Sequence, residues 1–206
     1  MDGSLKIKNY PILGGYILVN LWLLYLIFWG TRPDVSFFNN LQNLLPEGVA
    51  TTLIAVAFSE LISGETKARL IYQRWKYSLP GYRAFSEHAV RDPRVDRKVL
   101  EKRYGKLPNK EEAENKLWFK LSKLNETRPS VAYAHRYYLL MRDLSWVTLL
   151  LIATSIVAGI WTNADLRHWL KAEGILLAEF VITVRTAASF GVEFVRNVLA
   201  EESARP

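Results

Sequence analysis

Arg128 and His135 are the two residues whose types and spacing best suit catalysis, and six residues separate them in the segment RPSVAYAH. An imidazole transfers protons, and a guanidinium stabilises the negative charge that develops on phosphorus during phosphodiester cleavage. The chain has no cysteine, and His88, His135 and His168 are its only histidines. We therefore expect no metal site and no cofactor.

The spacing of Arg128 and His135 is similar to the Arg–x4–6–His motif of HEPN ribonucleases, in which both residues act at a dimer interface to cleave RNA. Pro129 follows the arginine here, whereas that family usually has a polar residue at this position. The resemblance implies a ribonuclease. The sequence contains no Walker A, GxSxG, HExxH or dinucleotide-binding motif that would indicate another enzyme class.

A second set of polar residues interrupts the last apolar segment of the chain, residues 174–199. At 100° per residue they fall on one arc of about 120° of a helix. We predict that this stripe lines a pore or an oligomer interface, because charges in a bilayer usually face a cavity or one another. Packing within its own bundle, or a helix lying flat on the membrane, are the alternatives. The predicted residues are Glu179, Arg185, Ser189, Glu193 and Arg196.

A third set comprises arginines in a strongly basic stretch. Residues 65–143 carry 19 Lys and Arg against 10 Asp and Glu, a net charge of +9, whereas the rest of the chain is at −2. Such charge sets membrane topology and attracts anionic lipids. It also suits an anionic partner, namely a nucleic acid, a nucleotide or an acidic protein surface. The predicted anion-binding residues are Arg83, Arg91, Arg94 and Arg97.

Apolar segments are the elements that must position these residues. Leu144–Trp161 and Ile12–Trp29 each contain 18 residues without a charge. A helix of this length spans about 27 Å, close to the hydrocarbon thickness of a bilayer. Val49–Ser63 is a shorter candidate, and Gly174–Leu199 is the last. The sequence therefore predicts four transmembrane helices, the last two joined by an outer loop at residues 163–173.

Turn and capping residues predict the helices of the basic stretch. Asp92 and Pro93 are typical of a helix start, and Gly105 of the stop that follows. Asn109 and Glu112 have the spacing of a capping box for the next helix. We find no strand-like alternation in the sequence.

Three segments carry a second resemblance: LPGYRAFS at Leu79–Ser86, DPRVD at Asp92–Asp96 and HRYYLLMRD at His135–Asp143. They resemble a pattern in uncharacterised bacterial multi-pass membrane proteins, some of which accompany antiviral defence genes. The resemblance implies a membrane effector or sensor that answers an infection signal through its cytosolic part.

The sequence thus predicts an all-α protein of the bacterial inner membrane with both termini in the cytoplasm. Its expected parts are a transmembrane hairpin (1–64), a basic helical cytosolic domain (65–143) and a second hairpin with a tail (144–206). The leading function is non-enzymatic: a self-associating effector or scaffold that alters permeability. Expected partners are the bilayer, including anionic lipids, and a cytosolic protein, nucleotide or nucleic acid. The alternatives are a membrane-tethered ribonuclease using Arg128 and His135, and a transporter or export subunit.

Overall fold

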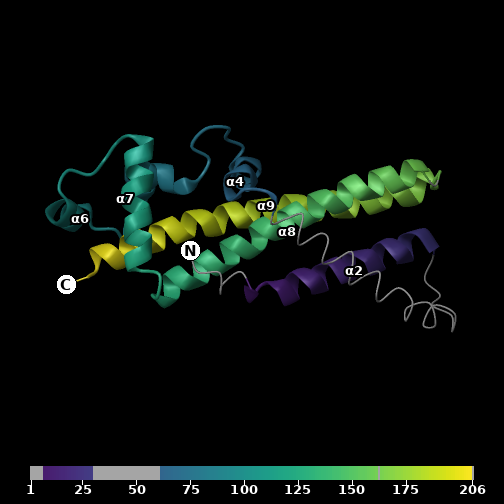
Figure 1. Cartoon of the computed structure of the whole chain (residues 1–206), viewed down its shortest axis with the longest axis horizontal. Helices are drawn as coiled ribbons and strands as arrows, with labels where there is room; N and C mark the ends of the chain where they lie inside the picture. The colour runs from purple at the N-terminus through teal and green to yellow at the C-terminus, as the bar shows by residue number, and fades with distance from the viewer. Residues whose placement is uncertain (1–6, 30–60, 162, 206) are drawn as a thin grey trace. The chain divides into compact units, whose positions relative to one another are not determined.

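The computed structural model describes residues 7–29, 61–161 and 163–205 (Figure 1). Within these residues every regular element is a helix and no strand occurs, which confirms the all-α prediction. Among the described residues, three helices are long and apolar enough to cross a membrane: α2 (Tyr10–Trp29), α8 (Pro129–Trp161) and α9 (Leu166–Ser203). The predicted second span, Val49–Ser63, lies outside the described residues except for its end.

The chain divides into two compact units. The first contains Met1–Ser63 and Asp143–Thr183, and the second contains Gly64–Arg142 and Val184–Pro206. Helices α8 and α9 therefore each contribute to both units. The C-terminal part of α9 is thus grouped with the basic stretch, and the predicted division at residues 64 and 143 stays a prediction.

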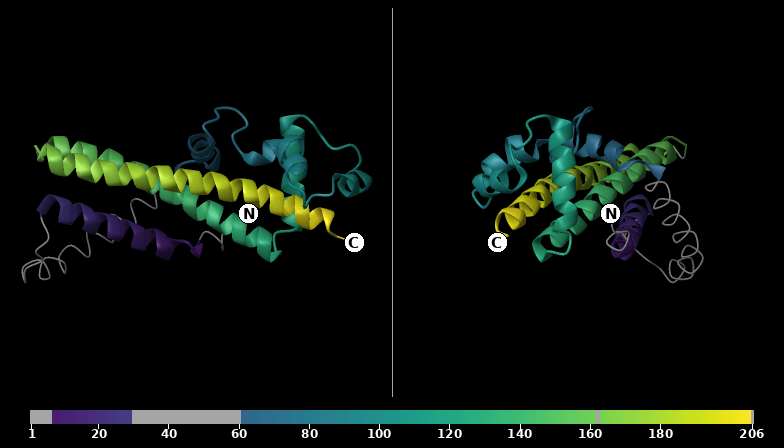
Figure 2. Two further views of the ribbon diagram at one scale, coloured as in Figure 1. Left: turned by 180° about the vertical axis from the view of Figure 1, so that it is seen from behind. Right: turned by 60° about the vertical axis from the view of Figure 1, so that its left-hand side comes forward.

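The first unit combines a small buried seam with many exposed apolar side chains. Leu13 and Ile17 of α2, Val147 of α8, and Ala172 and Leu176 of α9 are buried, and the parts of α8 and α9 in this unit run side by side (Figures 1 and 2). Large exposed apolar surfaces mark sites of membrane or protein contact. Those of this unit include Val19, Trp22, Val157, Ile160, Trp161, Leu170, Leu177, Val181 and Ile182.

Helix α9 begins earlier than the sequence indicates. The predicted outer loop at 163–173 is wrong beyond Asp165, since α9 starts at Leu166. The Asp165 carboxylate accepts hydrogen bonds from the backbone N–H groups of Arg167 and His168, both at 3.1 Å. An aspartate in this position caps the helix and favours it over a loop.

The second unit has a conventional apolar core. It contains α4 (Gly64–Tyr72), the short helical segments η1 (Pro80–Arg83), η2 (Ala84–His88) and α5 (Ala89–Arg91), then α6 (Arg97–Tyr104), α7 (Glu111–Leu124), the start of α8 and the end of α9. Helix α7 crosses the C-terminal part of α9, and α6 lies near the C-terminal end of α9 (Figures 1 and 2). The core these elements share includes Phe85, Leu100, Trp118, Leu121, Val131, Phe194, Val195, Val198 and Leu199.

Two predicted helix starts need correction. The cap of α6 is Asp96, which accepts from the backbone N–H groups of Lys98 and Val99, and not Asp92. Helix α7 has no side-chain cap, so the predicted capping box is absent, and Glu112 instead accepts a hydrogen bond from Tyr77. The stop at Gly105 is confirmed: its φ of +77° is one that glycine adopts readily.

The LPGYRAFS segment has a clear structural role. The Glu114 carboxylate of α7 is buried and accepts from the backbone N–H groups of Phe85 and Ser86 at 2.7 and 2.9 Å. Gly81 lies so close to α7 that a Cβ there would meet the Trp118 ring at 2.5 Å. The segment is therefore held against α7 by backbone contacts that few other residues permit.

Candidate functional site

An open groove of about 570 Å³ lies in the second unit, lined by Arg94, Ala188, Ser189, Val192, Glu193 and Arg196. It brings together residues that are about a hundred positions apart in the sequence. Arg94 belongs to the predicted anion-binding set, and Ser189, Glu193 and Arg196 belong to the predicted polar stripe. The groove therefore joins members of these two sets.

Arg94 is fixed in the groove by three of its five N–H groups. Its Nη2 donates to Asp92 Oδ2 at 2.7 Å, its Nε donates to the same carboxylate, and its Nη1 donates to Asn197 Oδ1 at 3.0 Å. The hydrogen bond from Arg94 is the main reason that the pKa of Asp92 lies below its usual value. Asn197 in turn donates to the backbone carbonyl of Ser130 at 3.1 Å. Arg94 is thus preorganised, half-exposed and left with two donors for a ligand.

Arg196 supplies the second cation of the groove. Its Nε is buried and has no hydrogen-bond partner among the described residues. Leaving a buried donor unpaired costs roughly 1–3 kcal/mol, more for a charged group. Glu193, one helical turn earlier, adds one exposed acid to the lining. The groove therefore presents two guanidinium groups, one carboxylate and the hydroxyl of Ser189.

The other predicted anion-binding arginines lie elsewhere in the second unit. Arg83 and Arg91 both pair with Glu87, at 3.0 and 2.9 Å, and Arg97 approaches Glu101 at 3.9 Å. None of the three lines the groove. Only Arg94 of this set lies there.

Glu179 is separated from the rest of the polar stripe. It lies in the first unit, where its carboxylate accepts from the Tyr16 hydroxyl at 2.6 Å, and Thr148 lies 2.7 Å from the same hydroxyl. The buried Asn20 donates to the Tyr16 carbonyl at 3.2 Å. This cluster joins α2, α8 and α9, and favours packing within the bundle as the role of Glu179. Arg185 is exposed in the second unit.

Arg128 and His135 have separate contacts. Arg128 Nε lies 3.8 Å from Glu201 Oε2, and the His135 ring stacks on Phe194 with centroids 4.4 Å apart. Seven residues of helix correspond to a rise of about 10 Å. A reaction that uses both would therefore need a second copy or a substrate bridging them, and the ribonuclease interpretation stays a prediction.

His88 is a buried titratable residue that the sequence did not single out. Its side chain is in the core of the second unit, and neither ring nitrogen has a hydrogen-bond partner among the described residues. Burial lowers the pKa of His88 to about 4, with the nearby charges of Arg83, Arg196 and Arg91 acting in the same direction and Glu87 opposing them. His88 is therefore neutral in the folded protein at neutral pH.

The stability of the second unit should consequently fall in mild acid. Because the pKa of His88 is lower in the folded state than its ordinary 6.5, the unfolded state binds the proton first, and stability decreases from about pH 6.5 down to about pH 4. The loss should be roughly 2–3 kcal/mol. Thermal unfolding of wild type and His88→Leu in detergent measures this loss. The stability of the wild type relative to the variant should fall as the pH decreases. A His168→Asn control, at an exposed histidine, should keep the wild-type profile.

No protein-family model matches the chain, and it has no significant similarity to a curated protein or to a solved structure.

Proposed function

We propose that this protein is a non-enzymatic membrane effector or scaffold whose basic helical unit binds an anionic group of a cytosolic partner in the Arg94–Arg196 groove. The observation that carries the proposal is the buried, unpartnered Nε of Arg196 beside the preorganised Arg94. The groove residues 188–196 lie on α9, a continuous helix that also forms part of the apolar first unit. A ligand in the groove would thus contact an element that belongs to both units.

The membrane arrangement proposed with it has four spans, with the basic unit inserted between the second and third and both termini in the cytoplasm. The net charge of +9 over residues 65–143 supports this orientation, because Lys and Arg near membrane ends favour the cytoplasmic side. The proposal also includes self-association through the exposed face of α9 that carries Arg185 and Ser189. It places the protein in a bacterial inner membrane, with a role in antiviral defence.

The chemistry of the groove favours an acidic protein segment as the partner. Two guanidinium groups bind carboxylates through paired N–H donors, and Arg is preferred to Lys where this geometry matters. Glu193 weakens the attraction for a bare anion but accepts a hydrogen bond from a partner backbone or side chain. The groove therefore suits a carboxylate that is accompanied by a donor, as in a peptide.

Fluorescence anisotropy of a fluorescein-labelled oligoglutamate peptide, with the full chain in detergent, tests the proposal. Arg196→Gln should weaken binding about tenfold, a loss of roughly 1.4 kcal/mol. Glu193→Gln should strengthen it a few-fold, because the variant removes a like charge from the site. Arg97→Gln removes the same charge outside the groove and should change the dissociation constant less than about twofold.

Each outcome has a distinct meaning. A gain in affinity for Glu193→Gln cannot come from damage to the fold, so the opposite signs of the two groove variants locate the site. Equal weakening by Arg196→Gln and Arg97→Gln would show instead that the whole basic face attracts the peptide. Failure of the wild type to bind at low salt would reject an acidic partner.

A further inference from the structure

Residues 73–77 form a loop that presents a tryptophan to solvent. Trp75 is 86% exposed, and Arg74 and Lys76 on either side of it are exposed as well. Gln73 and Tyr77 both have positive φ values, 51° and 53°. Non-glycine residues rarely adopt this conformation, and it persists only where the surrounding structure holds it. The loop is therefore shaped to expose Trp75.

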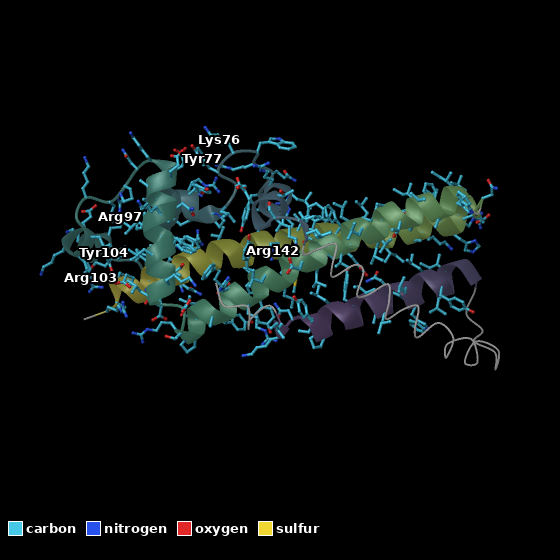
Figure 3. The ribbon with its side chains drawn as sticks, viewed as in Figure 1. Lys76, Tyr77, Arg97, Arg103, Tyr104 and Arg142 are labelled. Carbon is cyan, nitrogen blue, oxygen red and sulfur yellow. The ribbon has the colours of Figure 1, made fainter. Side chains whose placement is uncertain are left out.

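The base of the loop is fixed to the second unit. The Tyr77 hydroxyl donates to Glu112 of α7, and its ring packs on that of Tyr82 at a centroid distance of 5.0 Å. Lys76 Nζ lies 4.8 Å from the centroid of the Tyr77 ring. Figure 3 shows Lys76 and Tyr77 at an outer edge of this unit, away from Arg103 and Tyr104. The Trp75 side chain is thus exposed to solvent on a loop whose end is fixed by the contacts of Tyr77.

The surroundings of Trp75 are positively charged. No acidic residue occurs between positions 73 and 77, where Arg74 and Lys76 give a charge of +2. Arg83 lies close enough that, after the effect of burial, the charge of Arg74 is the next cause that lowers the pKa of the Arg83 guanidinium. The loop combines an exposed indole with clustered cations, which is the composition of a surface that binds anionic headgroups.

Chain length keeps this loop near the bilayer. The predicted second span ends at Ser63, and α4 follows from Gly64 to Tyr72. Nine helical residues rise about 13 Å, and three extended residues add at most about 10 Å. Trp75 therefore lies within roughly 25 Å of the end of that span, a distance that permits contact with the headgroup layer.

We propose that the Gln73–Tyr77 loop is a lipid-binding site, in which Trp75 inserts at headgroup level and Arg74 and Lys76 bind anionic phospholipid phosphates. The site is distinct from the groove. The proposal rests on the proposed four-span arrangement and not on the binding of a partner in the groove. It assigns the exposed indole to the bilayer and not to a protein partner, because the adjacent charge and the short tether both favour the membrane surface.

Limited trypsin digestion of the full chain in nanodiscs tests the lipid-binding site, because both faces of a nanodisc are open to the protease. Discs of phosphatidylcholine alone are compared with discs containing about one third phosphatidylglycerol, and mass spectrometry follows cleavage after Arg74 and Lys76. Cleavage there should be at least about fivefold slower in the anionic discs. Cleavage after the exposed Lys110 of the same unit should change less than about twofold.

Trp75→Ala keeps both cleavage sites and should abolish most of the protection, while the unfolding temperature in detergent stays that of the wild type. Equal cleavage rates in the two lipid compositions would overturn the proposal, and so would full protection in Trp75→Ala. A second readout uses the absence of cysteine: an NBD dye on Gln73→Cys, which is exposed and leaves Trp75 in place, should be quenched by spin-labelled lipid in anionic discs. A dye that is quenched only when a soluble protein is added would assign the loop to a protein partner.

Discussion

Replacing Glu202 with glutamine should destabilise the second unit by roughly 3 kcal/mol, within the range for breaking a buried ion pair. The Glu202 carboxylate is only 1% exposed. It accepts from Arg103 Nη1 at 2.9 Å, the Tyr104 hydroxyl at 2.7 Å, Asn125 Nδ2 at 2.7 Å and Arg205 Nη1 at 3.2 Å. Glutamine removes the negative charge that these donors share, and its NH₂ group would face their N–H and O–H groups. Thermal or denaturant unfolding of the full chain in detergent measures the loss.

Glu201 provides a matched control for this experiment. It is next in sequence, half-buried, and accepts from the Ser130 hydroxyl at 2.6 Å, with Arg128 at 3.8 Å. Since one side of it is open to water, Glu201→Gln should cost less than about 1 kcal/mol. Equal unfolding midpoints for Glu202→Gln and the wild type would mean that the network contributes no net stability.

The Glu202 network also restrains the movement of α9 that the proposed ligand binding could cause. Its partners are two residues of α6, Asn125 directly after α7, and Arg205, so it fixes the C-terminal end of α9. Figure 3 shows Arg103 and Tyr104 at this end. A helix clamped there cannot rotate or shift without breaking buried charge-assisted hydrogen bonds. We therefore expect Glu202→Gln to weaken any coupling between the groove and the first unit.

Much of the helical framework could be predicted from the sequence. Uninterrupted apolar runs indicated α2 and the membrane half of α8, because helix length and bilayer thickness constrain them directly. Gly105 could be assigned as a stop because its backbone conformation is one that glycine favours. The start of α6 was missed because two aspartates are candidates for the cap. The carboxylate of Asp92 instead accepts hydrogen bonds from Arg94, two residues later, and Arg94 is held in turn by Asn197 of α9.

The groove could not be predicted from local patterns. The helical period grouped Ser189, Glu193 and Arg196, which line the groove together, but the partner cation, Arg94, comes from a loop that only the tertiary fold brings there. The same period also grouped them with Glu179, which the fold places in the other unit. Helix α9 belongs to both units, so residues that share one face of it can have different neighbours and different roles.

Gly191→Ala should destabilise the second unit by about 2–3 kcal/mol, the cost of inserting a methyl group into a packed interior. A Cβ at this position would overlap the Tyr72 hydroxyl and lie 3.0–3.1 Å from the Tyr138 ring. Those rings come from α4 and α8, so Gly191 is a position at which side chains of both helices pack against the backbone of α9. For a chain of this length the unfolding temperature should fall by roughly 5–10 °C.

Two further variants separate this overlap from a simple change in helix propensity. Gly174→Ala is the matched control, because it lies on the same helix with nothing within 4 Å of the added Cβ, and it should be neutral or stabilising by less than about 1 kcal/mol. Tyr72→Phe removes the hydroxyl that Gly191→Ala would strike. The double variant Tyr72→Phe with Gly191→Ala should therefore be more stable than the sum of the single effects implies, and strict additivity would show that α4 does not pack on α9 at this glycine.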